Sequence, residues 1–482
     1  MDISISVGNP QGTVDQNIYG HFIEHILDCI DGGIYDPSSI FADSMGLRTD
    51  VMEKWRRLAP PVLRFPGGTV TCQYHWEDAV GPKEKRIRRK NLIWGGELDP
   101  AFGTCEFITL CRELGAEPMI CVNMASGTPE EASNWVEYCN GTGNTYYANL
   151  RRSHGYEEPF NVMYWCIGNE CYAEPDIGIH NDVKLYIRDA MEFVKFMKLT
   201  DKRIKTLIVA CDDDSWNKSV LDGLHWVTDY VSYHHYSSEN GLGIYGPFAG
   251  AQDLQRAVAK LSALIDSYPE DVSDFNPWYR FPPRQEKMKI AIDEWNIWDV
   301  MPDEDYGLHM VYNWRDALWT ASILNLFIEE THIGMANLAQ SVNVMAPILT
   351  REDGCWYQTI AYPLILYRNT MYGARIPLSY PSPTIDGGPA GQIDAVSVSA
   401  VKKPDGMICI GAVNRDFHHA HRLVLETNSS FPSDRAHVTI LTGTSPEAIC
   451  TIDSSCVISR ELECSLDQLL LPPGSVCLIT IP

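Results

Sequence analysis

The stretch VMYWCIGNE (residues 162–170) is the part of the sequence that decides the fold. Its first residues are almost continuously apolar, which is typical of a strand buried on both faces. It then ends in Gly168, Asn169 and Glu170, and polar groups at a buried strand end are costly unless they serve a purpose. A second stretch of the same kind, KIAIDEWN (residues 289–296), carries Glu294 near its end. Together they predict interior strands whose polar tips have a function.

Runs of this kind recur from about residue 18 to residue 345 and alternate with longer amphipathic stretches. The alternation predicts an α/β fold with a parallel sheet. Eight candidate strands fit a closed (β/α)8 TIM barrel better than an open sheet. They cover residues 19–25, 61–68, 117–125, 162–170, 206–213, 230–236, 289–296 and 335–343. The stretch TPEEASNWVEYCN (residues 128–140) predicts a helix with Thr128 as N-cap, Pro129 in its first turn and Glu131 completing a capping box.

Beyond about residue 360 short strand-like runs are separated by Pro, Gly, Ser and Asp. This pattern predicts an all-β domain, a sandwich of the jelly-roll type. The segment DISISV (residues 2–7) also reads as a strand. We therefore expect a catalytic barrel over residues 18–350 and a β-sandwich over residues 355–482, and we expect the N-terminal strand of residues 1–17 to pair into the sandwich.

Composition and charge narrow the class of partner. The formal net charge of −25 repels phosphate backbones and anionic lipid, so we expect no nucleic acid and no membrane partner. No apolar run is long enough for a membrane span, and the first residues lack the basic and apolar regions of a signal peptide, so we expect no secretory signal. The 15 cysteines form no C-x-x-C pair, which favours reduced thiols, a cytoplasmic protein and no metal site.

Several predicted strands end in polar residues, and the C-terminal ends of barrel strands converge on the active site of such folds. These residues are Glu24, Arg64, Asn169, Glu170, His234, Tyr236, Glu294 and Gln340. Either glutamate at the tips of the fourth and seventh strands could by itself cap a helix or pair with an arginine. The two together favour glycosidic cleavage, in which one carboxyl group attacks and the other acts as acid and then base. A retaining enzyme places them about 5 Å apart.

Aromatic residues near these tips favour a carbohydrate ligand, because sugar C–H faces pack on indole rings. They are Trp94, Trp295 and Trp298, with Tyr74 and Trp76 after the FPGG turn. Packing of helices against the barrel is the alternative for some of them. No nucleotide site is expected, because the glycines at 67–68 lack phosphate-loop spacing.

The chain resembles the α-L-arabinofuranosidases of glycoside hydrolase family 51, which belong to the retaining glycosidases of clan A. The resemblance runs through GHFIEHI, LRFPGG, YHWED, GTPEEASNWVEYCNG, the GNE of residues 168–170, DYVSYHHY, IDEWNIW and NLAQSVNV, and covers most of residues 19–350. It implies release of terminal α-L-arabinofuranosyl units from arabinose-containing oligosaccharides and polysaccharides, in L-arabinose metabolism. It also implies no cofactor, no metal and a homo-oligomer, commonly a hexamer.

Carried over to this sequence, the resemblance implies a role for each matching residue. Glu294 would be the nucleophile and Glu170 the acid/base. Asn169 would bind the sugar 2-hydroxyl, and His234 and Tyr236 would hold the nucleophile and the sugar. The pocket for the terminal furanose would be lined by Glu24, Arg64 and Gln340, and its leaving-group side by Trp94 and Trp298.

One pocket residue departs from the family pattern. Thr69 stands where the family usually has an asparagine, and a hydroxyl cannot bridge two sugar oxygens as an amide does. Loss of one contact is worth roughly 1–3 kcal/mol, enough to change the preferred sugar. The alternatives are therefore a related furanosidase, for example a galactofuranosidase, or a β-glycan hydrolase. An alternative from another class is a non-catalytic carbohydrate-binding barrel.

Overall fold

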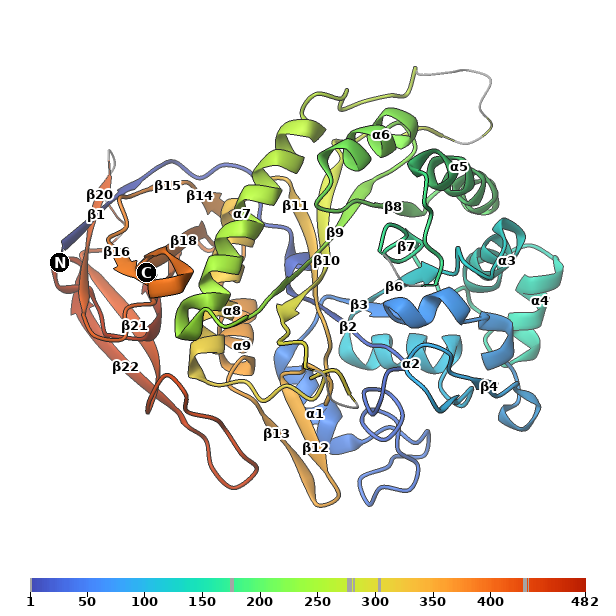
Figure 1. Cartoon of the computed structure of the whole chain (residues 1–482), viewed down its shortest axis with the longest axis horizontal. Helices are drawn as coiled ribbons and strands as arrows, with labels where there is room; N and C mark the ends of the chain where they lie inside the picture. The colour runs from blue at the N-terminus through green and yellow to red at the C-terminus, as the bar shows by residue number, and fades with distance from the viewer. Residues whose placement is uncertain are drawn as a thin grey trace.

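Eight parallel strands form a closed barrel at the centre of the molecule, as the sequence predicts (Figure 1). A computed structural model describes residues 2–173, 177–274, 280, 282–301, 305–427, 431 and 433–482. In chain order the barrel strands are β2 (Gly20–Phe22), β3 (Val62–Phe65), β6 (Glu117–Val122), β7 (Tyr164–Ile167), β8 (Lys205–Val209), β9 (Tyr230–Ser237), β10 (Lys289–Ile297) and β11 (Ile333–Leu338). β11 pairs with β2 and thereby closes the barrel.

Helices follow each barrel strand, so the structure has the expected (β/α)8 order. They are α1 (Thr49–Leu58), α2 (Thr104–Leu114), α3 (Pro129–Asn140), α4 (Tyr146–Ser153), α5 (Val183–Thr200), α6 (Asp214–Leu224), α7 (Gly246–Ile265), α8 (Trp314–Glu329) and α9 (Ala361–Thr370). Short 3-10 turns cover Gln16–Tyr19, Thr69–Gln73, Trp76–Ala79, Lys83–Lys85, Gly243–Tyr245, Gly388–Ala390 and Leu466–Gln468. Within the described ranges no helix has the length and apolar character that a membrane crossing requires.

The predicted helix after the third barrel strand forms, with one difference in its cap. Thr128 accepts a hydrogen bond from the backbone N–H of Glu131 at 3.1 Å, and Pro129 is the first helical residue. The carboxylate of Glu131, however, bonds to Nδ1 of His75 at 2.9 Å. The second half of the predicted capping box is therefore wrong, because a tertiary partner takes the side chain that would have closed it.

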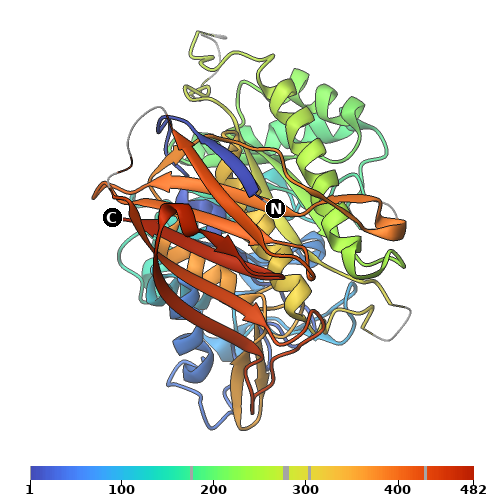
Figure 2. The ribbon, with the colours of Figure 1, turned by 90° about the vertical axis from the view of Figure 1, so that its left-hand side faces the viewer.

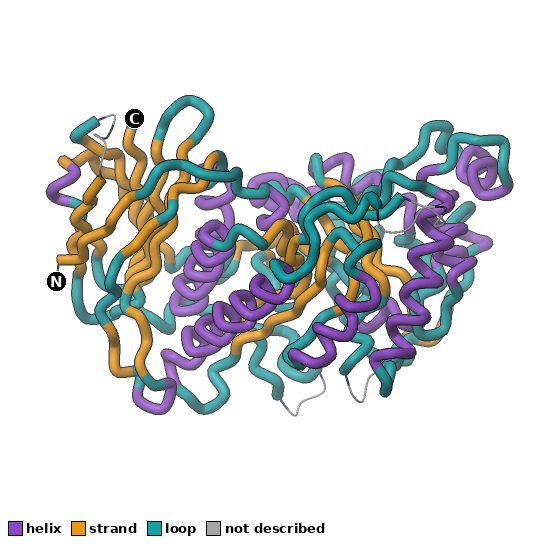
Figure 3. The backbone as a smooth tube through the Cα atoms, turned by 90° about the horizontal axis from the view of Figure 1, so that it is seen from above, coloured by secondary structure: helices purple, strands orange, loops and turns teal. Residues whose placement is uncertain are grey.

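A β-sandwich lies at one end of the molecule, beside the barrel, and both chain termini lie in it (Figures 2 and 3). One sheet has the order β15 (Leu378–Ser379), β1 (Asp2–Val7), β20 (His421–Thr427), β23 (Leu470–Leu471). The other has the order β14 (Ala374–Ile376), β18 (Val396–Lys402), β19 (Ile408–Asn414), β24 (Ser475–Ile481), β21 (Arg435–Gly443), β22 (Val457–Ser465). Three hairpins pair β4 (Arg89–Lys90) with β5 (Glu97–Leu98), β12 (Ile348–Arg351) with β13 (Gly354–Tyr357), and β16 (Thr384–Asp386) with β17 (Gln392–Asp394).

The sandwich has a core of its own, to which both ends of the chain contribute. Ile3 and Ile5 of β1 are buried against Val398, Ile410 and Leu423. β1 reaches this core because it runs parallel to β20 and bonds along its full length. The first strand of the chain therefore completes a sheet built from its last hundred residues.

The barrel and the sandwich are joined through α8 and α9. Asn325 of α8 donates to the backbone carbonyl of Ser397 in β18 at 3.0 Å and accepts from the hydroxyl of Tyr367 in α9 at 3.0 Å. α9 belongs to the apolar core of the barrel through Ala361, Leu364 and Tyr367. The boundary expected at residues 350–355 thus lies before the last helix that packs on the barrel.

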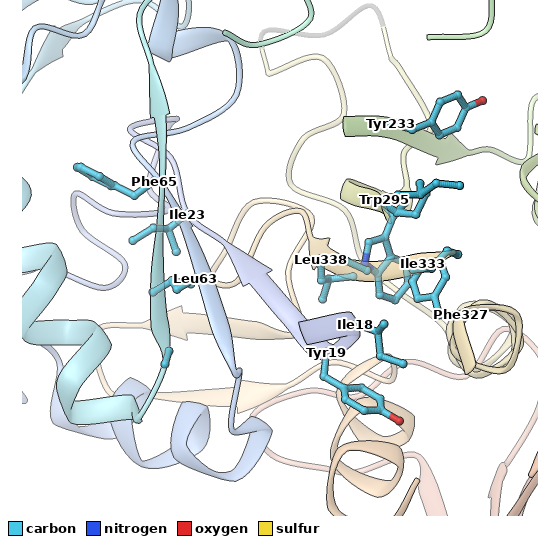
Figure 4. Packing of buried hydrophobic residues seen from close by; sticks show 14 of the residues in the cluster. Ile18, Tyr19, Ile23, Leu63, Phe65, Tyr233, Trp295, Phe327, Ile333 and Leu338 are labelled. Atoms are coloured by element: carbon cyan, nitrogen blue, oxygen red, sulfur yellow. The ribbon is translucent and has the colours of Figure 1, made fainter. Parts of the chain in front are cut away.

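Side chains fill the barrel in layers, which leaves only its C-terminal mouth for a site. The lower interior is apolar and includes Val62, Met119, Leu207 and Met335. The outer faces of the strands pack on the helices; Trp295, Ile333 and Leu338 lie together with Phe327 in this layer (Figure 4). Side chains alternate between the two faces of a strand, so the residue two positions after each of these apolar residues again faces the inside and lies nearer the mouth.

Candidate active site

A β-bulge in β10 turns two successive carboxyl groups into the barrel. Ala291 pairs with Ser232 of β9, but the next pair is Glu294 with His234, so three steps on β10 match two on β9. A bulge of this kind re-aims the side chains that follow it. As a result Asp293 and Glu294 both point to the inside, and their side chains are 0% and 7% exposed.

Glu170 is positioned by a tight turn at the end of β7. Its backbone has φ +44°, in the left-handed region that side chains rarely adopt, and this costs roughly 1–3 kcal/mol. Gly168 precedes it with φ +83°, and a Cβ there would lie 2.6 Å from the sulfur of Cys171. The turn places Asn169 and Glu170 at the barrel mouth.

The carboxylates of Glu170 and Glu294 approach each other closely. One oxygen of each, together with a ring nitrogen of His234, forms a group whose atoms all lie within 4.8 Å of one another. Retaining glycosidases hold their carboxyl groups about 5–5.5 Å apart, whereas inverting ones need about 6.5–9.5 Å. Oxygen atoms this close favour the shorter, retaining separation of the two carboxyl groups over the inverting one.

Arg64 of β3 contacts both the nucleophile candidate Glu294 and the residues beside the two glutamates. Its guanidinium donates to Oε1 of Glu294 at 2.6 Å and to Oδ1 of Asn169 at 2.7 Å, and its Nε lies 3.4 Å from Asp293. The ring of Phe22 lies 4.6 Å below the guanidinium carbon. A buried arginine of this kind fixes the rotamers of its partners, because its planar fork binds in only one orientation.

His234 of β9 connects the acid side of the site to Asp293. Its Nδ1 lies 2.8 Å from Oε1 of Glu170, and its Nε2 lies 3.5 Å from Oδ1 of Asp293. Burial lowers the pKa of His234, but the charges of Glu294 and Asp293 outweigh burial and raise it well above the usual value. Burial raises the pKa of Glu170, but the hydrogen bond and charge of His234 outweigh it and bring the pKa below the usual range. Both shifts favour the state in which the proton of this pair resides on His234.

Tyr236 and Glu24 line the pocket around the two carboxylates. The hydroxyl of Tyr236 donates to Oε2 of Glu294 at 2.8 Å. Glu24 accepts from the backbone N–H of Val70, from Nε1 of Trp94 and from Nε2 of Gln340, at 2.9–3.0 Å. Burial raises the pKa of Glu24, and the hydrogen bonds from Trp94 and Val70 only partly offset that effect.

Above these residues is a cavity of about 360 Å³. Its polar wall includes Glu24, Glu170, Glu294 and Gln340, and its apolar wall includes Trp94, Trp298, Tyr306 and Leu308. Trp298 packs edge-on against Tyr236, with ring centroids 5.6 Å apart, and its Nε1 donates to the carbonyl of Tyr306 at 3.0 Å. The loop with Tyr306 and Leu308 is fastened by His309, which bonds to Asp28 at 2.8 Å and to Asp305.

The structure brings all eleven sequence-predicted residues to this one place. Eight of them line the cavity: Glu24, Thr69, Trp94, Glu170, Tyr236, Glu294, Trp298 and Gln340. Arg64, Asn169 and His234 lie behind them and bond to the carboxylates or to one another. Thr69 forms the start of a 3-10 turn directly after Gly68. A Cβ added at Gly68 would lie only 3.1 Å from Oε1 of Glu294.

Three aromatic residues suggested for sugar contact lie elsewhere. Trp295 is 1% exposed and packs on Trp319 and Phe327 outside the barrel. Tyr74 and Trp76 are buried too, and Trp76 stacks on Trp135 of α3 at 6.0 Å. These three follow the packing alternative, because adjacent strand residues point to opposite faces and residues after a turn can fold back onto the core.

Sequence reasoning missed Asp293, a fully buried carboxylate that lies 3.4 Å from Nε of Arg64 and 3.5 Å from Nε2 of His234. It accepts a hydrogen bond from Ser232 at 2.6 Å. Burial raises its pKa, but Arg64 and His234 outweigh burial and bring the pKa below the usual range, so Asp293 stays ionised. The signal was present as two successive acidic residues in an otherwise apolar strand.

Glu170, His234 and Glu294 also have the residue types and closeness of a metal site. Their ligand atoms, however, are used within the protein. Nδ1 of His234 bonds to Glu170, and both oxygens of Glu294 accept hydrogen bonds. The positive charge that a metal would bring is already supplied by Arg64 and His234, so the donor set is that of an acid–base site.

Fold and site together define a glycoside hydrolase with two catalytic carboxyl groups on a (β/α)8 barrel. Comparison with known proteins identifies the family to which this glycoside hydrolase belongs. A family model described as "Alpha-L-arabinofuranosidase 1 domain" matches residues 54–256, and one described as "Alpha-L-arabinofuranosidase C-terminal domain" matches residues 293–468. The chain belongs to the α-L-arabinofuranosidases of glycoside hydrolase family 51.

Relatives with assigned names and solved structures agree with this placement. Alpha-L-arabinofuranosidase C of Emericella nidulans is 36% identical, over 92% of this chain and 90% of its own length. The intracellular exo-alpha-(1->5)-L-arabinofuranosidase 1 of Bacillus subtilis is 35% identical, over 73% and 72%. The arabinose complex of the Thermotoga maritima α-L-arabinofuranosidase superposes with a TM-score of 0.89 at 34% identity, covering 99% of both chains.

Proposed function

We propose that this chain is an exo-acting, retaining α-L-arabinofuranosidase that releases terminal arabinofuranosyl units from oligosaccharides. The observation that carries the proposal is the placement of the Glu170 and Glu294 oxygens within 4.8 Å, in the wall of a cavity of about 360 Å³. That volume is at the small end of the roughly 300–1,000 Å³ of ligand pockets. It suits one terminal sugar and not a chain passing through.

Glu294 acts as the nucleophile in the first step. Arg64 and Tyr236 each bind one of its oxygens and so fix the carboxylate in one orientation. Its attack on the anomeric carbon forms a glycosyl ester while the bond to the leaving oxygen breaks. In the second step water breaks this ester and Glu294 becomes a carboxylate again, with the configuration retained.

Glu170 delivers the proton in the first step and removes one from water in the second. The pair of Glu170 and His234 shares one dissociable proton, and the directions of the two pKa shifts favour its residence on His234 before the reaction. When a leaving oxygen lies against Glu170, this proton passes from His234 through the carboxyl group to that oxygen. The pair is then free to accept a proton from the attacking water.

The remaining residues select and hold the sugar. Asn169 is oriented by Arg64, and we assign it to the 2-hydroxyl, where hydrogen bonds strengthen in the transition state. Glu24 and Gln340 bond to each other and present oxygen and nitrogen atoms to the hydroxyls of the furanose. Trp94 and Trp298 line the side at which the leaving group departs.

Arabinofuranose is the sugar that the family and the relatives favour, and Thr69 is the residue that can modify the preference. It lines the same cavity as Glu24 and Glu294. Nitrophenyl α-L-arabinofuranoside, β-D-galactofuranoside and β-D-xylopyranoside test the proposal directly. The arabinoside should turn over fastest, and methanol as acceptor should yield the methyl α-arabinofuranoside. Faster hydrolysis of another sugar, or an inverted methyl product, would refute it.

We further propose that the enzyme is a homo-oligomer, a hexamer as in its family, that works in the cytoplasm. All 15 cysteines are free thiols, which suits a reducing compartment. Ile40, which is 83% exposed, is an apolar residue available for an interface. Light scattering at micromolar concentration tests the assembly: a monomer mass would refute it. Fractionation of the source cells tests the location.

A further inference from the structure

A second groove lies directly beside the catalytic cavity. It has a volume of about 550 Å³ and is lined by residues 238–241, which follow β9, and residues 298–301, which follow β10. Trp298 and Val300 line both this groove and the catalytic cavity. A ligand that leaves the cavity past Trp298 therefore enters the groove.

The described residues on the two sides of the groove are fixed by hydrogen bonds. The backbone N–H of Trp298 donates to the carbonyl of Ser237 at 2.9 Å, and the N–H of Glu239 donates to Oδ1 of Asp299 at 2.6 Å. Oε2 of Glu239 is held by Arg315 of α8 at 2.7 Å. The groove is therefore formed in the free protein, which lowers the entropic cost of binding a ligand.

The lining has both the polar and the apolar groups that a sugar requires. In the part of the chain that the structure describes, the side chains of Ser238 and Asn240 make no hydrogen bond with protein, and one oxygen of Asp299 is likewise unused. Val300 and Met301 are 66% and 51% exposed and supply an apolar side. Hydroxyl groups can both donate to the carboxylates and accept from the Asn240 amide.

Charge narrows the class of ligand. Among the described residues that line the groove there is no lysine or arginine, whereas Glu239 and Asp299 are both present. Arg315 already neutralises Glu239 from behind. A phosphate or a uronic acid would meet an unpaired carboxylate, so the lining favours a neutral, hydroxyl-rich ligand.

From this geometry we infer that the groove is a second leaving-group subsite, which binds the sugar one unit beyond the leaving residue of a neutral linear oligosaccharide. This inference rests on the proposed function and deepens it. The catalytic cavity takes the terminal arabinose, Trp298 contacts the next unit, and Asn240 with Met301 binds the one after. The enzyme then prefers linear arabino-oligosaccharides of three or more units.

The test compares three substrates that fill successive subsites: nitrophenyl α-L-arabinofuranoside, α-1,5-arabinobiose and α-1,5-arabinotriose. For the unmodified enzyme we expect kcat/KM to be about fivefold to tenfold higher for the triose than for the biose. Two variants remove the subsite. Asn240→Gly deletes the amide and suits the φ of +44° at this position. Met301→Ala deletes the apolar side.

Each variant should bring the triose-to-biose ratio close to one and leave the aryl substrate within about twofold of the unmodified enzyme. Asn149→Gly, on the exposed part of α4, is the matched control and should keep the full ratio. A ratio of one in the unmodified enzyme, or a ratio that survives both variants, overturns the subsite. Inactivity of the unmodified enzyme on all three substrates would instead overturn the proposed function, on which the subsite depends.

Discussion

Replacing Asp293 by Asn should shift the alkaline side of the pH–activity profile without removing any reacting group. Asp293 touches neither cavity nor leaving group, but it lies 3.5 Å from Nε2 of His234 and bonds to Ser232. Its negative charge, with that of Glu294, is what raises the pKa of His234 against the effect of burial. The asparagine keeps the shape and the hydrogen bond from Ser232 but removes the charge.

The size of the shift follows from the distance. Two unit charges about 4 Å apart interact by about 4 kcal/mol at an effective dielectric constant of 20, and one pKa unit corresponds to about 1.4 kcal/mol. Neighbouring charges at this range move measured pKa values by about 1–3 units. Without Asp293 the pair of His234 and Glu170 loses its proton more readily, so its apparent pKa falls. The alkaline limb of kcat/KM should therefore move to lower pH by about 1–3 units.

The assay is the pH dependence of kcat/KM on nitrophenyl α-L-arabinofuranoside, with thermal melting to establish that the variant is folded. Ser232→Ala is the matched control, because it removes the hydrogen bond to Asp293 and leaves the charge. It should shift the alkaline limb by well under one unit. An unchanged limb in a folded Asp293→Asn variant would mean that His234 does not hold the proton, and would refute the charge assignment. A shift of equal size in Ser232→Ala would attribute the effect to geometry instead.

Four further substitutions test other parts of the site. Glu294→Ala should lower kcat by at least about 10³-fold, and azide should restore turnover with a product of inverted configuration. Glu170→Ala should slow substrates with poor leaving groups most, and azide should then give a product of retained configuration. If the two azide products have the opposite configurations, the two roles are reversed. Thr69→Asn should raise kcat/KM for the arabinofuranoside by about fivefold or more if the amide gains a sugar contact, and a gain on the galactofuranoside instead would contradict the assigned specificity. Burial lowers the pKa of His309, but its two aspartate partners raise it overall. The stabilisation of the loop by the protonated His309 is therefore present at acidic pH and is lost as pH rises through the raised pKa. KM should therefore increase with pH, and a His309→Gln variant should have a KM that is higher and flat; a pH-dependent KM in that variant would refute the role of His309 as a fastener.

The fold could be predicted from the sequence because its signals are local. Each barrel strand is a short apolar run, and the polar residue at its tip marks the C-terminal mouth, as Glu170 and Gln340 illustrate. The change from strand–helix alternation to short strands near residue 360 likewise predicts the sandwich. The expected boundary between barrel and sandwich at residues 350–355 stays a prediction; α9, which follows it, packs into the apolar core of the barrel.

The inner details of the site depended on a register that no local pattern reveals. In a regular strand, Asp293 and Glu294 would point to opposite faces, and only the bulge against β9 brings both inside. The same bulge decides that Trp295 faces the helices and Trp298 the cavity, although both follow Glu294 closely. The groove beside Trp298 could not be predicted from the sequence for a similar reason. Its two walls come from segments 60 residues apart, which meet through the hydrogen bond between Glu239 and Asp299.

With the roles proposed above, the charges of the site would allow both steps of the reaction to run without exchange of a proton with bulk water in between. Before the reaction Glu170, Asp293 and Glu294 supply three negative charges, and Arg64 and His234 supply two positive ones, so one negative charge remains. In the proposed intermediate Glu294 is a neutral ester, and the pair of His234 and Glu170 has given its proton to the leaving group. The net charge is again one negative. The buried ion pair of Arg64 and Asp293 stays constant throughout, and it supplies a fixed electrostatic field in which only the nucleophile and the proton move.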